Sequence, residues 1–292
     1  MTSRTPRHEL RKMLVPGAAL LLPGVANALA ARVVADQGFA AAYVTGAGIA
    51  NTFFGIPDIG LVTLSELAVH VAAIRDVFSS PLVVDADTGF GNAVNMIRTV
   101  QLLERAGADA LQIEDQVFPK RCGHFAGKAV IPAAEMMAKI KAAVDARRDD
   151  DLLIIARTDA IAPEGFAAAL ERAAAYREAG ADVTFVEAPT STEQICDIPR
   201  HLPWPQLINI VIGGRTPELP NAKLKELGYA GVIYANVALQ AALKGMQAAL
   251  GELRRKGHMG EAQNLLADFS ERQRLVQKDE FDVLEHKYST KD

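Results

Sequence analysis

A lone cysteine with charged neighbours is the residue of this chain that best suits proton transfer. Cys122 stands in the stretch QIEDQVFPKRCGHFAGK, residues 112–128. Lys120 and Arg121 precede it and His124 follows, and nearby positive charge favours the thiolate over the thiol. The polar loop argues against the ordinary alternative, in which a lone cysteine is a small buried apolar residue. For His124 three roles stay open: donation to an oxyanion, tuning of the thiol, or a loop hydrogen bond.

Three carboxylates follow two apolar runs. Asp85 and Asp87 end the run LVVDAD, where their i, i+2 spacing predicts the same side of a strand, and Glu114 ends the run ALQIE. An all-oxygen set suits a hard cation such as Mg²⁺, which keeps several waters. The alternative is that these acids cap helices or pair with basic residues. Gly89 and Gly91 allow a ligand to approach the backbone closely, and with the third acid they favour a metal site.

Two further segments suit the binding of an anion. In VTGAG, residues 45–47 follow an apolar strand, and their small side chains leave backbone N–H groups for a substrate carboxylate. The alternative is a close-packed strand end without a ligand. Arg157, in IIARTDA, suits bidentate binding of a carboxylate. Its alternative is a structural ion pair with Glu114 or Glu187.

Composition excludes several classes of protein. The 31 basic and 35 acidic residues give a net charge of −4 without a basic stripe, so we expect no nucleic-acid partner. No apolar stretch reaches the roughly 20 residues of a membrane helix. Prolines and glycines interrupt the apolar run 13–22, which argues against a signal peptide. Two cysteines cannot form a disulfide framework, so a reducing, cytoplasmic setting is expected.

The elements that must position these residues alternate between short apolar runs and longer Ala-rich amphipathic segments, which predicts an α/β fold with parallel strands. The candidate residues follow many different strands, which favours a closed (β/α)8 TIM barrel over an open sheet. We expect a barrel domain over residues 1–246 and a C-terminal helical extension over residues 247–292 that packs on the barrel or on a neighbouring subunit. The expected strands are 20–23, 41–45, 82–87, 110–114, 152–157, 183–187, 206–211 and 231–234.

Taken as a set, seven motifs resemble the isocitrate lyase and phosphoenolpyruvate mutase superfamily, and within it the branch of 2-methylisocitrate lyases and 2,3-dimethylmalate lyases. They are VTGAG, GIPDIG, VVDADTGFGN, QIEDQVFPKRCGH, IIARTDA, FVEAP and NIVIGG, and the resemblance covers residues 20–246. The resemblance implies Mg²⁺, or Mn²⁺, near Asp85, held directly or through water by Asp87 and Glu114. It also implies a homotetramer in which a C-terminal helix is exchanged between subunits.

The resemblance further implies cleavage of a carbon–carbon bond in a 2-hydroxy dicarboxylate, giving pyruvate or a similar 2-oxo acid and a carboxylate. The motif cysteine of these lyases protonates the departing carbanion, and Cys122 matches its position. The implied catalytic residues are Cys122, His124, Arg157 and Glu187. The implied substrate-binding residues are Thr45, Gly46, Ala47, Asp58, Gly123, Arg157, Glu187, Asn209 and Ile212.

Two positions depart from the 2-methylisocitrate lyases. Those enzymes have a glutamate where this chain has Ile212 and an arginine where it has Gln240. Burying a third carboxylate without a cation is costly, so we expect a dicarboxylate with an apolar substituent, such as a 2,3-dialkylmalate. The alternatives are an oxaloacetate hydrolase or decarboxylase, a phosphonopyruvate-type mutase, and an inactive metabolite-binding barrel. The cysteine motif counts against the mutase and the decarboxylase, whose branches generally lack it.

Overall fold

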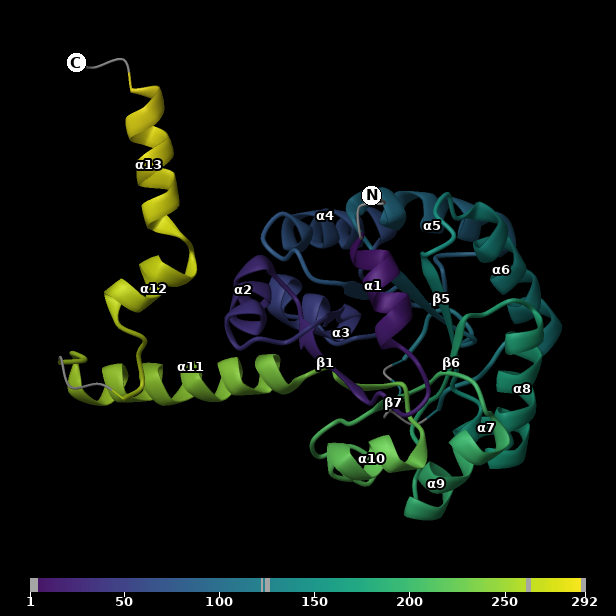
Figure 1. Cartoon of the computed structure of the whole chain (residues 1–292). Helices are drawn as coiled ribbons and strands as arrows, with labels where there is room; N and C mark the ends of the chain where they lie inside the picture. Colours follow the sequence, from purple (N-terminus) through teal and green to yellow (C-terminus); the bar gives the residue numbers. More distant parts are fainter. Residues whose placement is uncertain (1–4, 122, 124–126, 261–263, 290–292) are drawn as a thin grey trace.

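The computed structural model describes residues 5–121, 123, 127–260 and 264–289. Its eight strands form a closed parallel barrel in which each strand pairs with the next and β8 pairs with β1, as the sequence predicts (Figure 1). The expected strands 110–114 and 231–234 match at both ends, and the other six agree to within two residues. The strands are β1 (Leu20–Val25), β2 (Ala42–Val44), β3 (Leu82–Asp85), β4 (Ala110–Glu114), β5 (Leu153–Thr158), β6 (Val183–Val186), β7 (Gln206–Asn209) and β8 (Gly231–Tyr234).

Helices surround the barrel and bury their apolar faces against its outer surface. Some of them end at glycines with left-handed backbone; Gly107 and Gly228 cap two of them with φ of 104° and 101°. The surrounding helices are α2 (Ala28–Asp36), α4 (Leu64–Arg75), α5 (Ala93–Ala106), α6 (Ala133–Ala146), α8 (Phe166–Glu178), α9 (Thr192–His201) and α10 (Asn221–Leu227). Short elements follow two strands: α3 (Gly46–Ile49) and the π-helix η1 (Ala50–Phe54) after β2, and α7 (Ile161–Glu164) after β5.

An N-terminal helix, α1 (Pro6–Met13), was not expected from the sequence. Leu10 on this helix and Leu14 after it are buried in the apolar cluster that fills the barrel interior. Arg7 fixes the helix from outside, with its guanidinium 3.2 Å from both Glu104 and Asp149 carboxylates. Helix α1 therefore closes the N-terminal end of the barrel with apolar side chains. The polar residues of the cavity described below lie at the opposite end of the strands.

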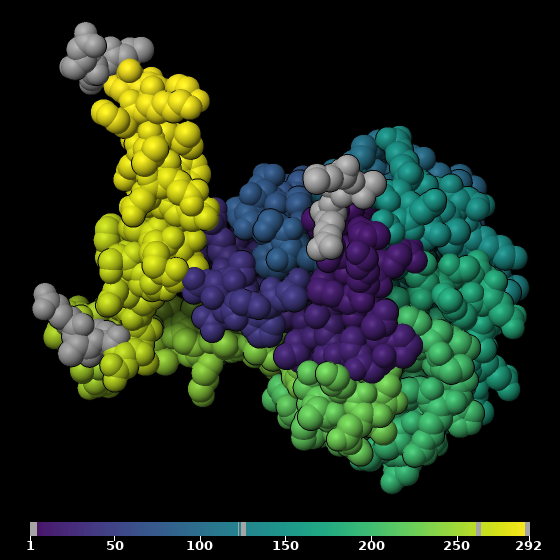
Figure 2. Space-filling model, viewed as in Figure 1, coloured from purple at the N-terminus to yellow at the C-terminus, as the bar shows by residue number. Residues whose placement is uncertain are grey.

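The C-terminal segment forms an arm that stands away from the barrel (Figures 1 and 2). It comprises α11 (Val237–Lys256), α12 (Phe269–Leu275) and α13 (Lys278–Tyr288). Arg274 on α12 returns to α2, where its guanidinium lies 2.8 Å from the Asp36 carboxylate. Helix α11 is continuous across residue 246, so the domain boundary there stays a prediction. Within the described ranges, the structure has no helix that is both long and apolar enough to span a membrane.

Candidate active site

A cavity of about 30 Å³ lies at the carboxyl ends of the strands. Residues within the carboxyl ends of β3 and β5 and residues after β2, β6, β7 and β8 contribute to it, together with the loop after β4. This is the arrangement by which TIM barrels assemble their active sites. Its lining residues are Thr45, Ala47, Asp58, Asp85, Lys120, Arg121, Gly123, Arg157, Glu187, Asn209, Val211, Ala235 and Asn236.

The three predicted metal-binding carboxylates are all buried at this end of the barrel. Asp85 is the last residue of β3, so strand alternation does not extend to Asp87; its position instead follows from a left-handed backbone with φ of 47°. Both carboxylates nevertheless face Gly46. A Cβ atom at that glycine would lie 3.6 Å from Asp85 Oδ2 and 3.4 Å from Asp87 Oδ1. The absence of a side chain at residue 46 keeps this space open.

Gly89 and Gly91 have a packing role in the structure, and the close approach of a ligand to them stays a prediction. Both have positive φ, and a Cβ atom at Gly89 would lie 2.0 Å from Met96 Cε, while one at Gly91 would lie 2.3 Å from Asn95 Oδ1. Met96 and Asn95 belong to α5. These glycines therefore let the loop after β3 pack tightly on α5.

Lys120 bridges two acids of the site. Its buried ammonium pairs with Asp58 and lies 2.8 Å from Asp87 Oδ1. Burial disfavours the ammonium, but the carboxylates of Asp87 and Asp58 outweigh burial and raise the pKa of Lys120 well above its usual value. The sequence interpretation used this lysine only to favour a thiolate at residue 122. In the structure its charge is paired with carboxylates.

The buried acids fit a divalent cation. Burial, opposed by Lys120, raises the pKa of Asp87 to about 6, and burial raises the pKa of Glu114 well above its usual value. Among the described residues, Glu114 Oε1 is buried without a hydrogen-bond partner. In the part of the chain that the structure describes, no group of three or more His, Cys, Asp or Glu side chains is arranged to hold a metal ion. Mg²⁺ needs only one or two carboxylates besides water and substrate oxygens, so the donor set suits it.

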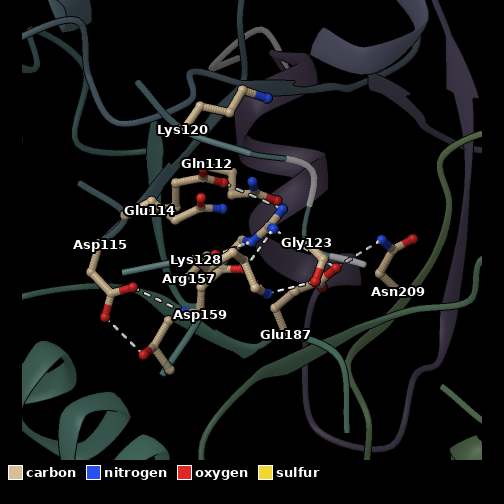
Figure 3. Close-up of polar contacts among 12 residues, drawn as sticks. Gln112, Glu114, Asp115, Lys120, Gly123, Lys128, Arg157, Asp159, Glu187 and Asn209 are labelled. Carbon is tan, nitrogen blue, oxygen red and sulfur yellow. Dashed lines mark hydrogen bonds and ion pairs between the residues drawn. The ribbon is translucent and has the colours of Figure 1, made fainter. Parts of the chain in front are cut away.

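Arg157 is the centre of a buried ion-pair network (Figure 3). Its Nε lies 2.9 Å from Asp159 Oδ2, Nη1 lies 3.4 Å from Glu114 Oε2, and Nη2 lies 3.7 Å from Glu187 Oε1. Lys128 approaches Asp159 from the other side, with its Nζ 2.8 Å from Oδ1. Burial opposes ionisation of Asp159, but Arg157 and Lys128 lower its pKa to about 2. Both structural partners suggested for Arg157 are therefore present.

Gly123 brings the loop after β4 against this network. A Cβ atom there would lie 2.3 Å from Glu187 Oε1 and 2.5 Å from Arg157 Nη2. Lys128 donates from its Nζ to the Gly123 carbonyl. Cys122 and His124, predicted as catalytic residues, lie outside the described residues. Gly123 lies between these two residues in sequence, and its own main chain lies against Glu187 and Arg157.

Comparison with known proteins decides the family. Residues 10–254 match the phosphoenolpyruvate phosphomutase family. The chain is 41% identical to 2,3-dimethylmalate lyase of Eubacterium barkeri, over 97% of this chain and 98% of the relative. It is 47% identical to 2-methylisocitrate lyase of Aeropyrum pernix, over 86% of this chain and 81% of the relative. The chain belongs to the PEP mutase/isocitrate lyase superfamily.

Solved structures of this superfamily share the fold over nearly the whole chain. A crystal structure of 2,3-dimethylmalate lyase superposes with a TM-score of 0.91 at 36% identity, covering 97% of this chain and 95% of that one. The structure of oxaloacetate acetylhydrolase with the inhibitor 3,3-difluorooxalacetate has a TM-score of 0.89 at 33% identity, covering 96% of each chain. The structure of phosphonopyruvate hydrolase with oxalate and Mg²⁺ has a TM-score of 0.86 at 31% identity, covering 97% of this chain and 99% of that one. The superfamily thus includes lyases, hydrolases and mutases.

Most of the residues predicted for a superfamily site do converge. Gly46, Asp87 and Glu114 border the cavity without lining it, whereas Ile212 lies outside, with 48% of its side-chain surface exposed. The Ile212 carbonyl accepts a hydrogen bond from Gln240 Nε2 at 3.3 Å, so these two departures from the 2-methylisocitrate lyases are neighbours. The predicted residues that line the cavity are Thr45, Ala47, Asp58, Asp85, Gly123, Arg157, Glu187 and Asn209.

Sequence reasoning missed five lining residues: Lys120 as an ion-pair partner, and Arg121, Val211, Ala235 and Asn236. Lys120 and Arg121 stand in the cysteine motif, so their proximity was available as a signal. Ala235 and Asn236 directly follow β8, and the rule that functional residues follow barrel strands would have included them. Val211 has no chemical group that draws attention to it.

Proposed function

We propose that this chain is a Mg²⁺-dependent carbon–carbon lyase that cleaves a 2-hydroxy dicarboxylate, of the 2,3-dialkylmalate or 2-methylisocitrate type, to pyruvate or a similar 2-oxo acid and a carboxylate. The observation that carries the proposal is the meeting of Asp85, Asp87 and Glu114 with Arg157 at one end of the barrel. The three acids can bind a cation, and the neighbouring guanidinium can bind a carboxylate. Together they suit a substrate that carries a hydroxyl group and two carboxylates.

Asp85, Asp87 and Glu114 would hold the cation, either directly or through water. Mg²⁺ supplies a Lewis acid that polarises the oxygens of the half-molecule that becomes the 2-oxo acid, and Mn²⁺ has the same preference for oxygen ligands. Support comes from the burial of Asp87, because a carboxylate removed from water gains a strong electrostatic partner when a cation binds. A similar solved structure, of phosphonopyruvate hydrolase, was obtained with Mg²⁺.

The remaining side chains would orient the substrate and hold its protons. Arg157 would bind a carboxylate, and the network with Asp159 and Lys128 keeps its guanidinium fixed for that purpose. Asn209 donates from Nδ2 to Glu187 Oε1 at 3.5 Å and would hold that acid in place. Ala47 would receive the second carboxylate through its backbone N–H at the start of α3, beside Thr45, whose own backbone N–H donates to the Val25 carbonyl.

Cys122 would protonate the carbanion that departs when the carbon–carbon bond breaks. This role rests on its place in the KRCGH motif and on the superfamily resemblance. General acid catalysis by a positioned side chain contributes about 10²–10⁴-fold to a rate. His124 would support the proton transfer, either by tuning the thiol or by a hydrogen bond to a developing oxyanion.

For the substrate we propose a dialkylmalate in preference to methylisocitrate. The support is the pair Ile212 and Gln240, which places an aliphatic and an uncharged side chain where the tricarboxylate lyases of the superfamily carry an acid and a base. A third carboxylate would find no cation in this pair. The relative named 2,3-dimethylmalate lyase matches over 97% of this chain, and the relative named 2-methylisocitrate lyase from Aeropyrum pernix matches over 86%.

A second candidate is hydrolysis of oxaloacetate to oxalate and acetate. It is favoured by the similarity to oxaloacetate acetylhydrolase, at a TM-score of 0.89 over 96% of each chain. The two reactions differ in their products. Purified protein with Mg²⁺ should be assayed on malate, 2,3-dimethylmalate, isocitrate, methylisocitrate and oxaloacetate, with separate detection of pyruvate and oxalate. Pyruvate from dimethylmalate supports the lyase; oxalate from oxaloacetate as the main product contradicts it.

We also propose that the enzyme is a homotetramer in which C-terminal helices are exchanged between subunits. Exposed apolar side chains support a second copy as the partner, because a large exposed apolar surface on an extended arm favours burial in an assembly. They include Leu243, Met246 and Leu250 on α11, and Phe281 and Val283 on α13. Light scattering after size exclusion tests the proposal, and truncation after residue 257 should reduce the assembly. A monomer at micromolar concentration would contradict it.

A further inference from the structure

A chain of two buried hydrogen bonds runs across the barrel interior to Asp85. The Tyr43 hydroxyl on β2 donates to Gln112 Oε1 on β4 at 2.8 Å, and Gln112 Nε2 donates to Asp85 Oδ1 on β3 at 3.2 Å. Exposed fractions are 3% for Tyr43, 0% for Gln112 and 8% for Asp85, so water does not compete for these groups. Three adjacent strands thus contribute to one polar chain that ends at a proposed metal ligand (Gln112 is shown in Figure 3).

The Tyr43 hydroxyl sets the direction of the amide. A glutamine amide has one end that accepts and one end that donates, and its orientation follows from its partners. With Oε1 engaged by the Tyr43 hydroxyl, Nε2 faces the Asp85 carboxylate. Without that hydroxyl the amide can turn, and its oxygen would then face a carboxylate oxygen, which is repulsive.

The contact also distinguishes the two oxygens of Asp85. Oδ1 accepts from Gln112 Nε2 at 3.2 Å and from the Asp87 backbone N–H at 3.2 Å. Oδ2 is the oxygen that faces Gly46, at 3.6 Å from the position of a Cβ atom there. The carboxylate is therefore held by one oxygen, while the other points into the space that Gly46 leaves open.

We propose that Tyr43 and Gln112 are positioning residues that hold Asp85 ready for a divalent cation. This inference rests on the proposed function, because it assumes that Asp85 is a ligand for Mg²⁺. Groups that hydrogen-bond a metal-ligating carboxylate fix its orientation, and removing them typically weakens metal binding about 10–100-fold. The competing explanation is purely structural: the two residues satisfy one another inside the barrel and affect stability alone.

The test measures Mg²⁺ binding in the absence of substrate. Isothermal titration calorimetry, or Mn²⁺ titration followed by electron paramagnetic resonance, is applied to the full-length protein and to Tyr43→Phe, Gln112→Leu and the double variant. Gln112→Leu should weaken binding about tenfold or more, and Tyr43→Phe should weaken it by a smaller factor. The double variant should bind no more weakly than Gln112→Leu, because the hydroxyl acts only through the amide.

A matched control is available on β7. Gln206 is also fully buried and hydrogen-bonds the Thr184 side chain, but neither residue contacts Asp85 in the structure as described. Gln206→Leu should lower the melting temperature measured in EDTA and leave the Mg²⁺ dissociation constant unchanged. Unchanged Mg²⁺ affinity in Gln112→Leu, or additive losses in the double variant, would overturn the inference. Wild-type protein that binds no Mg²⁺ would instead overturn the metal site itself.

Discussion

Gly123 lies so close to Glu187 that a Cβ atom on residue 123 would stand 2.3 Å from Glu187 Oε1. The same Cβ would stand 2.5 Å from Arg157 Nη2, so both partners of one ion pair touch the main chain of the loop. Real Cβ atoms do not approach other atoms this closely, and a side chain here must displace either the loop or the pair. The glycine thereby links the position of the cysteine-bearing loop to the position of the site's guanidinium.

Gly123→Ala should therefore impair catalysis without unfolding the protein. A shift of about 1 Å at a catalytic group can lower turnover about 10²-fold, and we expect a loss of this size in pyruvate release, with an unchanged circular dichroism spectrum. Gly245→Ala is the matched control, since Gly245 lies within α11 and a Cβ there meets nothing within 4 Å. Activity of Gly123→Ala at the level of Gly245→Ala would show that the loop does not need this contact.

Cys122→Ser should lower turnover by about 10²–10⁴-fold, because a hydroxyl is a far weaker acid than the thiol that it replaces. Binding of Mg²⁺ and of pyruvate should change little, since the proposed ligands for both lie on other residues. Steady-state kinetics and calorimetric titrations measure the two effects separately. Cys196→Ser provides the control, because Cys196 stands on α9 and does not line the cavity. Near-normal turnover would remove Cys122 from the mechanism.

Asp159 predicts a pH dependence of stability. Its pKa in the folded protein is about 2, below the ordinary value of 3.8. A lowered carboxyl pKa stabilises the fold above the unfolded-state pKa, and that contribution, about 2 kcal/mol, is lost as the pH falls from about 5 to about 2. Urea unfolding of wild type and Asp159→Asn across this range should give free energies that converge toward low pH. A constant difference between the two proteins would contradict the ion-paired state.

The fold was largely predictable because the signals that set it are local. The strand 110–114 is an apolar run bounded by Asp109 and by a polar loop, and it appears unchanged as β4. Helix α1 was missed because Leu10 and Leu14 become core residues only through a long-range contact with the barrel interior. Strand alternation was an incomplete reason to place Asp87 near Asp85, since a left-handed backbone at Asp87, which the sequence does not mark, sets its direction.

The sequence predicted in outline which residues lie together in the site, but it did not predict which charged side chains form ion pairs there. Strand-end residues of a barrel converge by topology, so Asp85, Arg157 and Glu187 were expected near one another. Which charges pair depends on side-chain reach. Lys120 was read as a neighbour of Cys122 in sequence, yet its four-carbon chain carries the ammonium to Asp58 and Asp87. Gln112 attracted no attention because nothing in its local sequence indicates the hydroxyl on β2.

Ile212 and Gln240 offer a test of substrate choice that needs no loss of function. Gln240 donates from Nε2 to the Ile212 carbonyl at 3.3 Å, so a charge at residue 240 lies beside residue 212. Gln240→Arg adds a cation for a third carboxylate, and a hydrogen bond to a charged group contributes about 1.5–3 kcal/mol. The ratio of kcat/KM for methylisocitrate to that for 2,3-dimethylmalate should rise by about tenfold or more. Gln240→Glu, with the opposite charge, should lower the same ratio.

If both variants leave the ratio unchanged, other residues determine the substrate, and the preference for an alkylmalate loses its basis in Ile212 and Gln240.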